Sequence, residues 1–138
     1  MIELVNILHM ENCSCAIWSE GNLTLCHKRG IIDLYSLLTG HPSVLSDAKI
    51  ADKVIGKGAA ALMILGKVKS VYADIISKPA LDLFRKYMIE VQYRELVPNI
   101  INRSGTGICP VETLCIDCNT AKECFPYIEK FINKINQK

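Results

Sequence analysis

Hydrophobic residues are densest between Asp47 and Gly66, and their spacing predicts a buried helix that is preceded by Ser46. At about 100° per residue, one apolar face collects Ala51, Val54, Ile55, Gly58, Ala61, Leu62 and Leu65. The segment 59–64 leaves little polar surface on the opposite side. A helix that is apolar all round belongs in the middle of a domain, so we expect the other elements to be arranged around it.

The remaining hydrophobic pattern predicts short elements on both sides of this helix. Before it we expect a helix over 2–11, a hairpin formed by 13–19 and 23–27, and a helix over 31–38. After it we expect a strand over 68–76, a helix capped by Ser77, a strand over 89–93, a short edge strand over 96–101, a helical turn over 111–116 and a last helix from a Thr120–Glu123 capping box to 136. This order predicts an α/β fold with parallel neighbouring strands.

Composition and charge limit the classes of protein to which this chain can belong. A chain of 138 residues that is 50% hydrophobic and 22% charged is typical of a single globular domain, here 1–138. Its 16 basic and 14 acidic residues are spread along the chain, which argues against nucleic-acid binding through charge. No apolar run reaches the roughly 20 residues of a membrane span, and the first residues do not form a secretory signal. Seven cysteines, an odd number, indicate reduced thiols and a cytoplasmic location.

Three stretches carry a family resemblance: DKVIGKGAAALMILGKV (52–68), ELVPNIINRSG (95–105) and GICPVE (107–112). They resemble a small bacterial family of uncharacterised proteins with a cytidine-deaminase-like fold, and the likeness covers most of 13–115. The resemblance implies a three-layer α/β/α sandwich in which a mixed sheet of four or five strands begins with an antiparallel hairpin. It implies no settled activity.

The sequence departs from the zinc-dependent deaminases at both of their metal motifs. Those enzymes place His or Cys two residues before a catalytic Glu at the start of the buried helix, and Pro-Cys-x-x-Cys at the start of the next helix. The matching residues here read Gly56-Lys57-Gly58-Ala59 and Ser77-Lys78-Pro79-Ala80. Because these side chains do not make a zinc site, we expect no metal, no other cofactor and no hydrolytic deamination.

Gly56 and Gly58 are unusual inside a helix, where each costs about 1 kcal/mol relative to alanine. One explanation is close packing of the helix on the sheet, especially at Gly58. The other is that the helix begins here and offers free N–H groups to an anion, which Lys57 would help to neutralise. We group Asp52 with these residues as a ligand-binding candidate, although on a continuous helix it projects about 140° away from Lys57, which argues against an ion pair between them.

The loop 102–110, NRSGTGICP, holds the other candidates. Asn102 and Arg103 are candidate ligand-binding residues. Cys109 precedes a proline-initiated helix whose dipole would lower the thiol pKa, and Glu112 would orient or cap, so these two residues form the candidate catalytic pair. The alternative is that Cys109 is a small buried hydrophobe and Glu112 an ordinary first-turn acid.

The cluster of Cys115, Cys118 and Cys124 favours core thiols over a metal or redox site. A structural zinc site needs four ligands, and only three cysteines lie here with no histidine after them. The three histidines of the chain, His9, His27 and His41, lack the spacing of paired metal ligands, and we interpret them as ordinary residues.

The function favoured by these residues is metal-free binding of a small anionic or nucleotide-like molecule on a deaminase-like scaffold. Two alternatives stay open. The first is a thiol-dependent enzyme that uses Cys109 in acyl or sulfur transfer. The second is a structural or interface protein, in which the edge strand over 89–93 pairs across a homodimer.

Overall fold

Strands and helices alternate through the middle of the chain, as the hydrophobic pattern predicts. The protein is described by a computed structural model that covers residues 1–28, 31–101, 105 and 107–136. Its elements, in chain order, are α1 (Ile2–Met10), β1 (Cys15–Ser19), β2 (Asn22–Cys26), α2 (Ile32–Gly40), the 3-10 turn η1 (Pro42–Val44), β3 (Lys49–Ile55), α3 (Lys57–Leu65), β4 (Ser70–Ser77), α4 (Lys78–Lys86), β5 (Glu90–Val97), α5 (Pro110–Cys115) and α6 (Ala121–Asn136).

The strands form one mixed sheet with the order β2-β1-β3-β4-β5. β1 is antiparallel to both β2 and β3, whereas β4 is parallel to both β3 and β5. The hairpin turns through Glu20 and Gly21, whose φ angles of 50° and 79° are both positive, as expected for a two-residue hairpin loop. The predicted antiparallel hairpin and mixed sheet are therefore confirmed.

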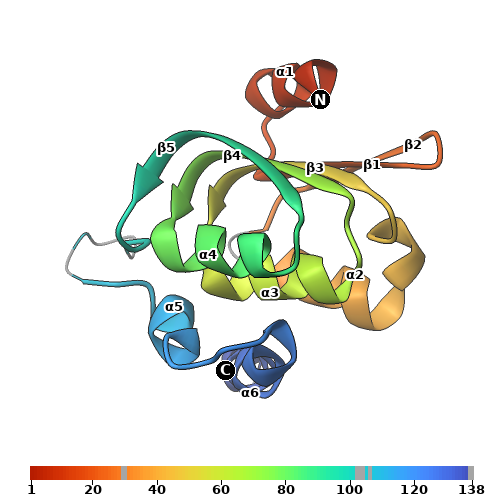
Figure 1. The fold of residues 1–138 in the computed structure, drawn as a ribbon. Coiled ribbons are helices and arrows are strands. Elements are labelled where there is room, and N and C mark those ends of the chain that lie inside the picture. Colours follow the sequence, from red (N-terminus) through yellow and green to blue (C-terminus); the bar gives the residue numbers. More distant parts are fainter. Residues whose placement is uncertain (29–30, 102–104, 106, 137–138) are drawn as a thin grey trace.

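Helices cover both faces of this sheet, which makes the fold a three-layer α/β/α sandwich (Figure 1). α1 lies on one face, where Leu4 and Leu8 pack against Ala16 and Ala51. α2, α3 and α4 lie on the other face, and α5 and α6 cover them from outside. Because α3 lies between the sheet and α6, all of its residues from Lys57 to Ile64 are buried.

One sequence prediction about the centre of the fold is wrong. The stretch 47–66 was predicted to be one helix. Instead, Lys49–Ile55 form the strand β3, and the helix α3 starts only at Lys57. The helical spacing was misleading because a strand that is covered on both faces has apolar residues without strict alternation. The β-branched Ile50, Val54 and Ile55 were the signal for a strand.

A second prediction, of a short edge strand over 96–101, is also wrong. Leu96 and Val97 are the last residues of β5, and Ile101 forms only an isolated bridge with Ile108. Pro98 lies between these two features, and its missing N–H is consistent with the end of the strand there.

The two predicted helix caps, at the starts of α4 and α6, are confirmed. The Ser77 hydroxyl accepts a hydrogen bond of 3.2 Å from the Ala80 N–H at the start of α4. Thr120 and Glu123 form both hydrogen bonds of a capping box, of 3.0 and 3.1 Å, before α6.

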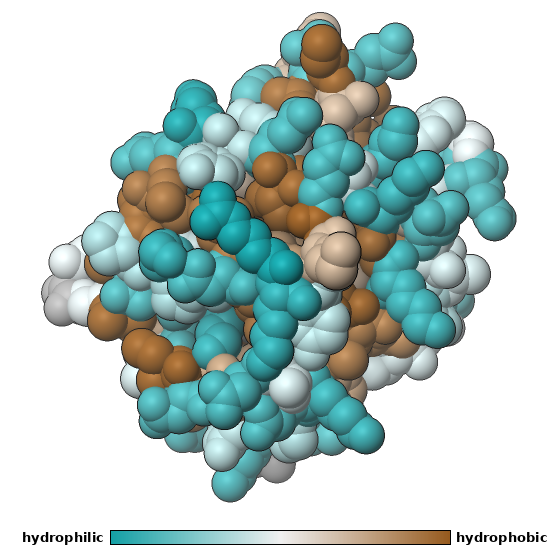
Figure 2. All heavy atoms as spheres, in the orientation of Figure 1, coloured by the Kyte–Doolittle hydropathy of each residue, from teal (hydrophilic) through white to brown (hydrophobic). Residues whose placement is uncertain are grey.

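Hydrophilic and hydrophobic side chains are interspersed over the face drawn in Figure 2. Within the residues described, none of the helices is both long and apolar enough to cross a membrane.

Candidate functional site

The start of α3 is closely packed by α5, and this packing accounts for its glycines. A Cβ atom on Gly58 would lie only 2.3 Å from Cγ1 of Val111, so any larger residue there would force Val111 or the part of α5 that carries it to shift. A Cβ atom on Gly56 would lie 3.2 Å from Cγ1 of Ile100 and 3.3 Å from Oε1 of Glu112. The contacts therefore favour close packing at both glycines, although the nearest neighbours belong to α5 and to Ile100 rather than to the sheet. The helix also begins here, as the other explanation required, because Gly56 is the N-cap residue of α3.

Glu112 supplies the negative charge at the start of α3. Its side chain is only 1% exposed. Oε1 accepts hydrogen bonds from the Lys57 N–H at 3.0 Å and from the Ser77 hydroxyl at 2.5 Å, and Oε2 accepts one from the Ile100 N–H. Glu112 thus caps α3 rather than its own helix, and it already occupies the Lys57 N–H, one of the groups at the start of α3 that an external anion would use.

The ammonium group of Lys57 points to the opposite end of α5. Lys57 is 7% exposed, and its Nζ donates to the carbonyl oxygens of Ile116 at 3.2 Å and Cys118 at 2.6 Å. These carbonyls follow the last turn of α5, where a positive charge is favourable. Lys57 and Glu112 therefore join α3 to both ends of α5.

Asp52 belongs to the middle of the sheet and not to the start of α3. It is 7% exposed, it lies opposite Cys15 on β1 and Ala73 on β4, and its Oδ1 accepts a hydrogen bond of 3.3 Å from the Val54 N–H. Burial raises the pKa of this carboxyl to about 7. Asp52 is the one described ligand-binding candidate that the structure does not bring together with Gly56, Lys57 and Gly58.

Cys109 is the N-cap residue of α5 and is half-buried. Its N–H donates to the Ile100 carbonyl at 2.8 Å, and its carbonyl accepts from the Thr113 N–H at 3.1 Å. Glu112, the partner proposed for it, directs its carboxylate to Lys57, Ser77 and Ile100 instead. Asn102 and Arg103 lie outside the residues that the structure describes.

The thiols of Cys115, Cys118 and Cys124 are buried and interact with one another. Burial raises the pKa of Cys118 to about 11, and a hydrogen bond with Cys115 raises the pKa of Cys124. The same hydrogen bond lowers the pKa of Cys115. In the described part of the chain, no three His, Cys, Asp or Glu side chains are placed to hold a metal ion.

A cavity of about 820 Å³ lies beside Lys57, where the parallel strands end. The end of β5, the start and outer face of α4, and the segment after α5 line it: Lys57, Lys78, Pro79, Asp82, Leu83, Lys86, Leu96, Val97, Pro98, Asn99, Ile116, Cys118 and Asn119. Three lysines and one aspartate, Asp82, are among these residues. Lys78 forms an ion pair of 2.7 Å with Asp82, and the ammonium group of Lys86 donates to the Asn119 carbonyl at 2.5 Å. The carboxyl ends of parallel strands are where open α/β sheets bind ligands.

Sequence reasoning missed most of this cavity. Of the proposed site residues that the structure describes, only Lys57 is part of the lining. The available signal was the four-residue spacing of Lys78, Asp82 and Lys86, which places all three on one face of the helix that follows β4. A second cavity, of about 770 Å³ between α5 and α6, is lined by none of the described candidates.

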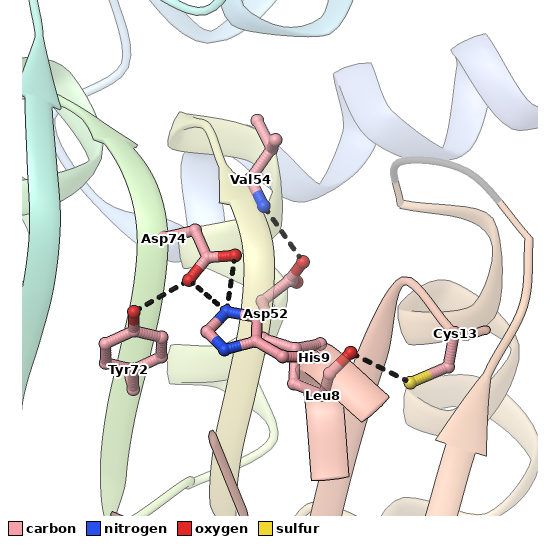
Figure 3. Close-up of polar contacts among 7 residues, drawn as sticks. All are labelled: Leu8, His9, Cys13, Asp52, Val54, Tyr72 and Asp74. Carbon is pink, nitrogen blue, oxygen red and sulfur yellow. Dashed lines mark hydrogen bonds and ion pairs between the residues drawn. The ribbon is translucent and has the colours of Figure 1, made fainter. Parts of the chain in front are cut away.

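A polar cluster on the other face of the sheet also went unpredicted (Figure 3). Nε2 of His9 on α1 lies 2.8 and 2.9 Å from the two carboxylate oxygens of Asp74 on β4, and the Tyr72 hydroxyl donates to the same carboxylate at 2.7 Å. Burial and the Asp74 hydrogen bond raise the pKa of Tyr72. This cluster ties the end of α1 to the sheet.

Comparisons with known proteins identify a solved structure with a similar fold and a family model that matches the sequence. No curated protein matches the chain. A crystal structure of a DUF1893 family protein from Thermotoga maritima has a TM-score of 0.85 with 24% sequence identity, and the match covers 94% of this chain and 87% of that one. At this identity the match shows a shared fold. The family resemblance expected from the sequence is confirmed by a family model, TM1506, a domain of unknown function (DUF1893), which matches residues 3–132: the chain belongs to the DUF1893 family.

Proposed function

We propose that this chain is a metal-free binding domain for a small anionic molecule, and that the ligand occupies the cavity beside Lys57. The observation that carries the proposal is the excess of lysine in a cavity of about 820 Å³ at the carboxyl ends of parallel strands. This volume lies within the range of about 300–1,000 Å³ that is typical of small-molecule sites.

The lining favours a ligand that has both an anionic group and an apolar or aromatic part. Lys78 and Lys86 lie along one side of α4, where Lys78 pairs with Asp82 and Lys86 donates to the Asn119 carbonyl. The N-terminal end of α4 also lies at the cavity, where its dipole favours an anion. Leu83, Leu96 and Ile116 supply apolar surface that would pack against a ring. A nucleotide-like molecule combines these two features.

The deaminase-like identity of the scaffold is part of the same proposal. In the zinc deaminases the buried helix starts at the metal. Here the start of α3 meets the Glu112 carboxylate and Ser77, which supports a scaffold that works without zinc. Stoichiometric zinc in a metal analysis of the purified protein would contradict this part.

Binding can be tested by calorimetry with inorganic phosphate, succinate and the four 5′-ribonucleotides, and by native mass spectrometry of the freshly purified chain. We expect at least one nucleotide to bind, and Lys78→Gln or Lys86→Gln to weaken binding about fivefold each through the lost charge. Lys122→Gln, an exposed lysine on α6, is the matched control and should bind normally. Absence of binding by every probe, together with a native mass equal to that of the bare chain, would refute the proposal.

Thiol catalysis by Cys109 receives less support, because Glu112 is not available to it as a base. The cytoplasmic location remains a proposal. It is supported by the seven cysteines, all of which are free thiols.

A further inference from the structure

β5 is an open edge of the sheet. It is the last strand in the order, and among the described residues it pairs only with β4. Six of its eight side-chain positions are exposed, including Tyr93 at 39% and Leu96 at 40%. The outer backbone N–H and C=O groups of such a strand form a template for pairing with another strand.

The charges on β5 are self-complementary in one antiparallel register. When two copies join their sheets around a two-fold axis perpendicular to the sheet, residues that face each other must belong to the same face in both copies. If the axis passes through Gln92, Glu90 of each copy faces Arg94 of the other, and Val91 faces Tyr93. This register gives two ion pairs and two pairs of an aromatic with a β-branched residue, both of which are favourable across strands.

The other registers lack this match. An axis through Val91 or Tyr93 leaves Glu90 and Arg94 opposite uncharged residues, and an axis through Glu90, Arg94 or Glu95 places two like charges opposite each other. Like charges directly opposite one another destabilise a strand pair. The charge pattern therefore selects the register centred on Gln92.

We propose that the chain forms a homodimer in which β5 pairs with β5 of a second copy, antiparallel and centred on Gln92, so that the two five-stranded sheets become continuous. The same register brings Met88, which is 91% exposed, towards Leu96 of the other copy. Because Leu96 also lines the cavity beside Lys57, the second copy would lie next to the rim of that cavity.

Sedimentation of the full chain across a wide concentration range tests the dimer. We expect a species of twice 15.4 kDa. Arg94→Glu or Glu90→Arg turns two attractive pairs into two repulsive ones and should raise the dissociation constant about thirtyfold. Glu20→Arg in the hairpin turn and Lys122→Glu on α6 are exposed controls that should leave the dimer intact.

Mixing the two charge-reversed chains tests the register itself. When a Glu90→Arg chain is mixed with an Arg94→Glu chain, both pairs between positions 90 and 94 again have one acid and one base, so a heterodimer should form although each chain alone dissociates. A monomer at every concentration, or a dimer that is indifferent to both substitutions, would overturn the proposal.

A covalent test does not depend on affinity. Gln92→Cys places the two introduced thiols opposite each other across the axis, so this variant should form a disulfide-linked dimer under mild oxidation. Arg94→Cys places the two sulfur atoms about 14 Å apart in this register and should not. The unmodified chain, oxidised in parallel, accounts for its native thiols, and equal cross-linking of both variants would rule out this register.

Discussion

Replacing Glu112 with glutamine should test whether this residue joins α3, α4 and α5 as the contacts indicate. Its two carboxylate oxygens accept from the Lys57 N–H, the Ser77 hydroxyl and the Ile100 N–H. A glutamine side chain has almost the same shape, but one of its two ends carries hydrogens. If the amide oxygen keeps the Lys57 and Ser77 bonds, the amide NH₂ faces the Ile100 N–H, and two donors then oppose each other.

The size of the effect follows from that geometry. One buried donor without an acceptor costs about 1–3 kcal/mol, and the loss of the negative charge at the start of α3 removes about 0.3–1 kcal/mol more. We therefore expect Glu112→Gln to lower the free energy of unfolding by about 2–3 kcal/mol. Glu112→Ala removes the acceptor of all three donors and should cost more, about 3–5 kcal/mol.

Urea unfolding followed by far-UV circular dichroism measures this change directly. Glu20→Gln, which alters an exposed glutamate in the hairpin turn, is the matched control and should stay within about 0.5 kcal/mol of the parent chain. If Glu112→Gln is as stable as this control, the carboxylate is not the acceptor that holds the start of α3, and the account of the site fails.

Two further predictions concern buried positions. The pKa of Asp52 is raised to about 7 from an ordinary value of 3.8, so the folded chain holds this proton more tightly than the unfolded chain, and the free energy of unfolding should fall by up to about 4 kcal/mol as pH rises from about 4 to about 7. Asp52→Asn should abolish that part of the pH dependence in urea unfolding, and an unchanged slope would contradict the assignment. Gly58→Ala should destabilise the chain by about 1 kcal/mol, because the clash of its Cβ with Val111, at 2.3 Å, outweighs the gain in helix propensity. Val111→Ala in the same chain should relieve the clash, so strictly additive effects in a double-mutant cycle would argue against it.

The sequence predicted those parts of the fold that depend on neighbouring residues. Ser77 and the Thr120–Glu123 box cap the helices they were expected to cap, because a capping hydrogen bond spans only two or three residues. The boundary between β3 and α3 was missed because a single residue, Gly56, separates two apolar segments, and apolar spacing alone does not distinguish a strand covered on both faces from a buried helix.

The candidate site was harder to predict because its contacts join distant parts of the chain. Glu112 was recognised as a capping residue, but the helix it caps begins 55 residues earlier in the sequence. His9 and Asp74 are 65 residues apart, and a lone histidine on an amphipathic helix gives no indication of its partner. Side-chain positions that depend on tertiary packing have no local pattern to reveal them.

The position of α3 between the sheet and α6 has a consequence for how the protein is made. On the ribosome, α3 emerges well before α6, and until α6 has been synthesised the outer side of an almost wholly apolar helix lacks its cover. The nascent chain therefore cannot complete its core in the order of synthesis. We expect folding to become cooperative only after α6 has left the exit tunnel, and we expect nascent chains that stall before α6 to aggregate.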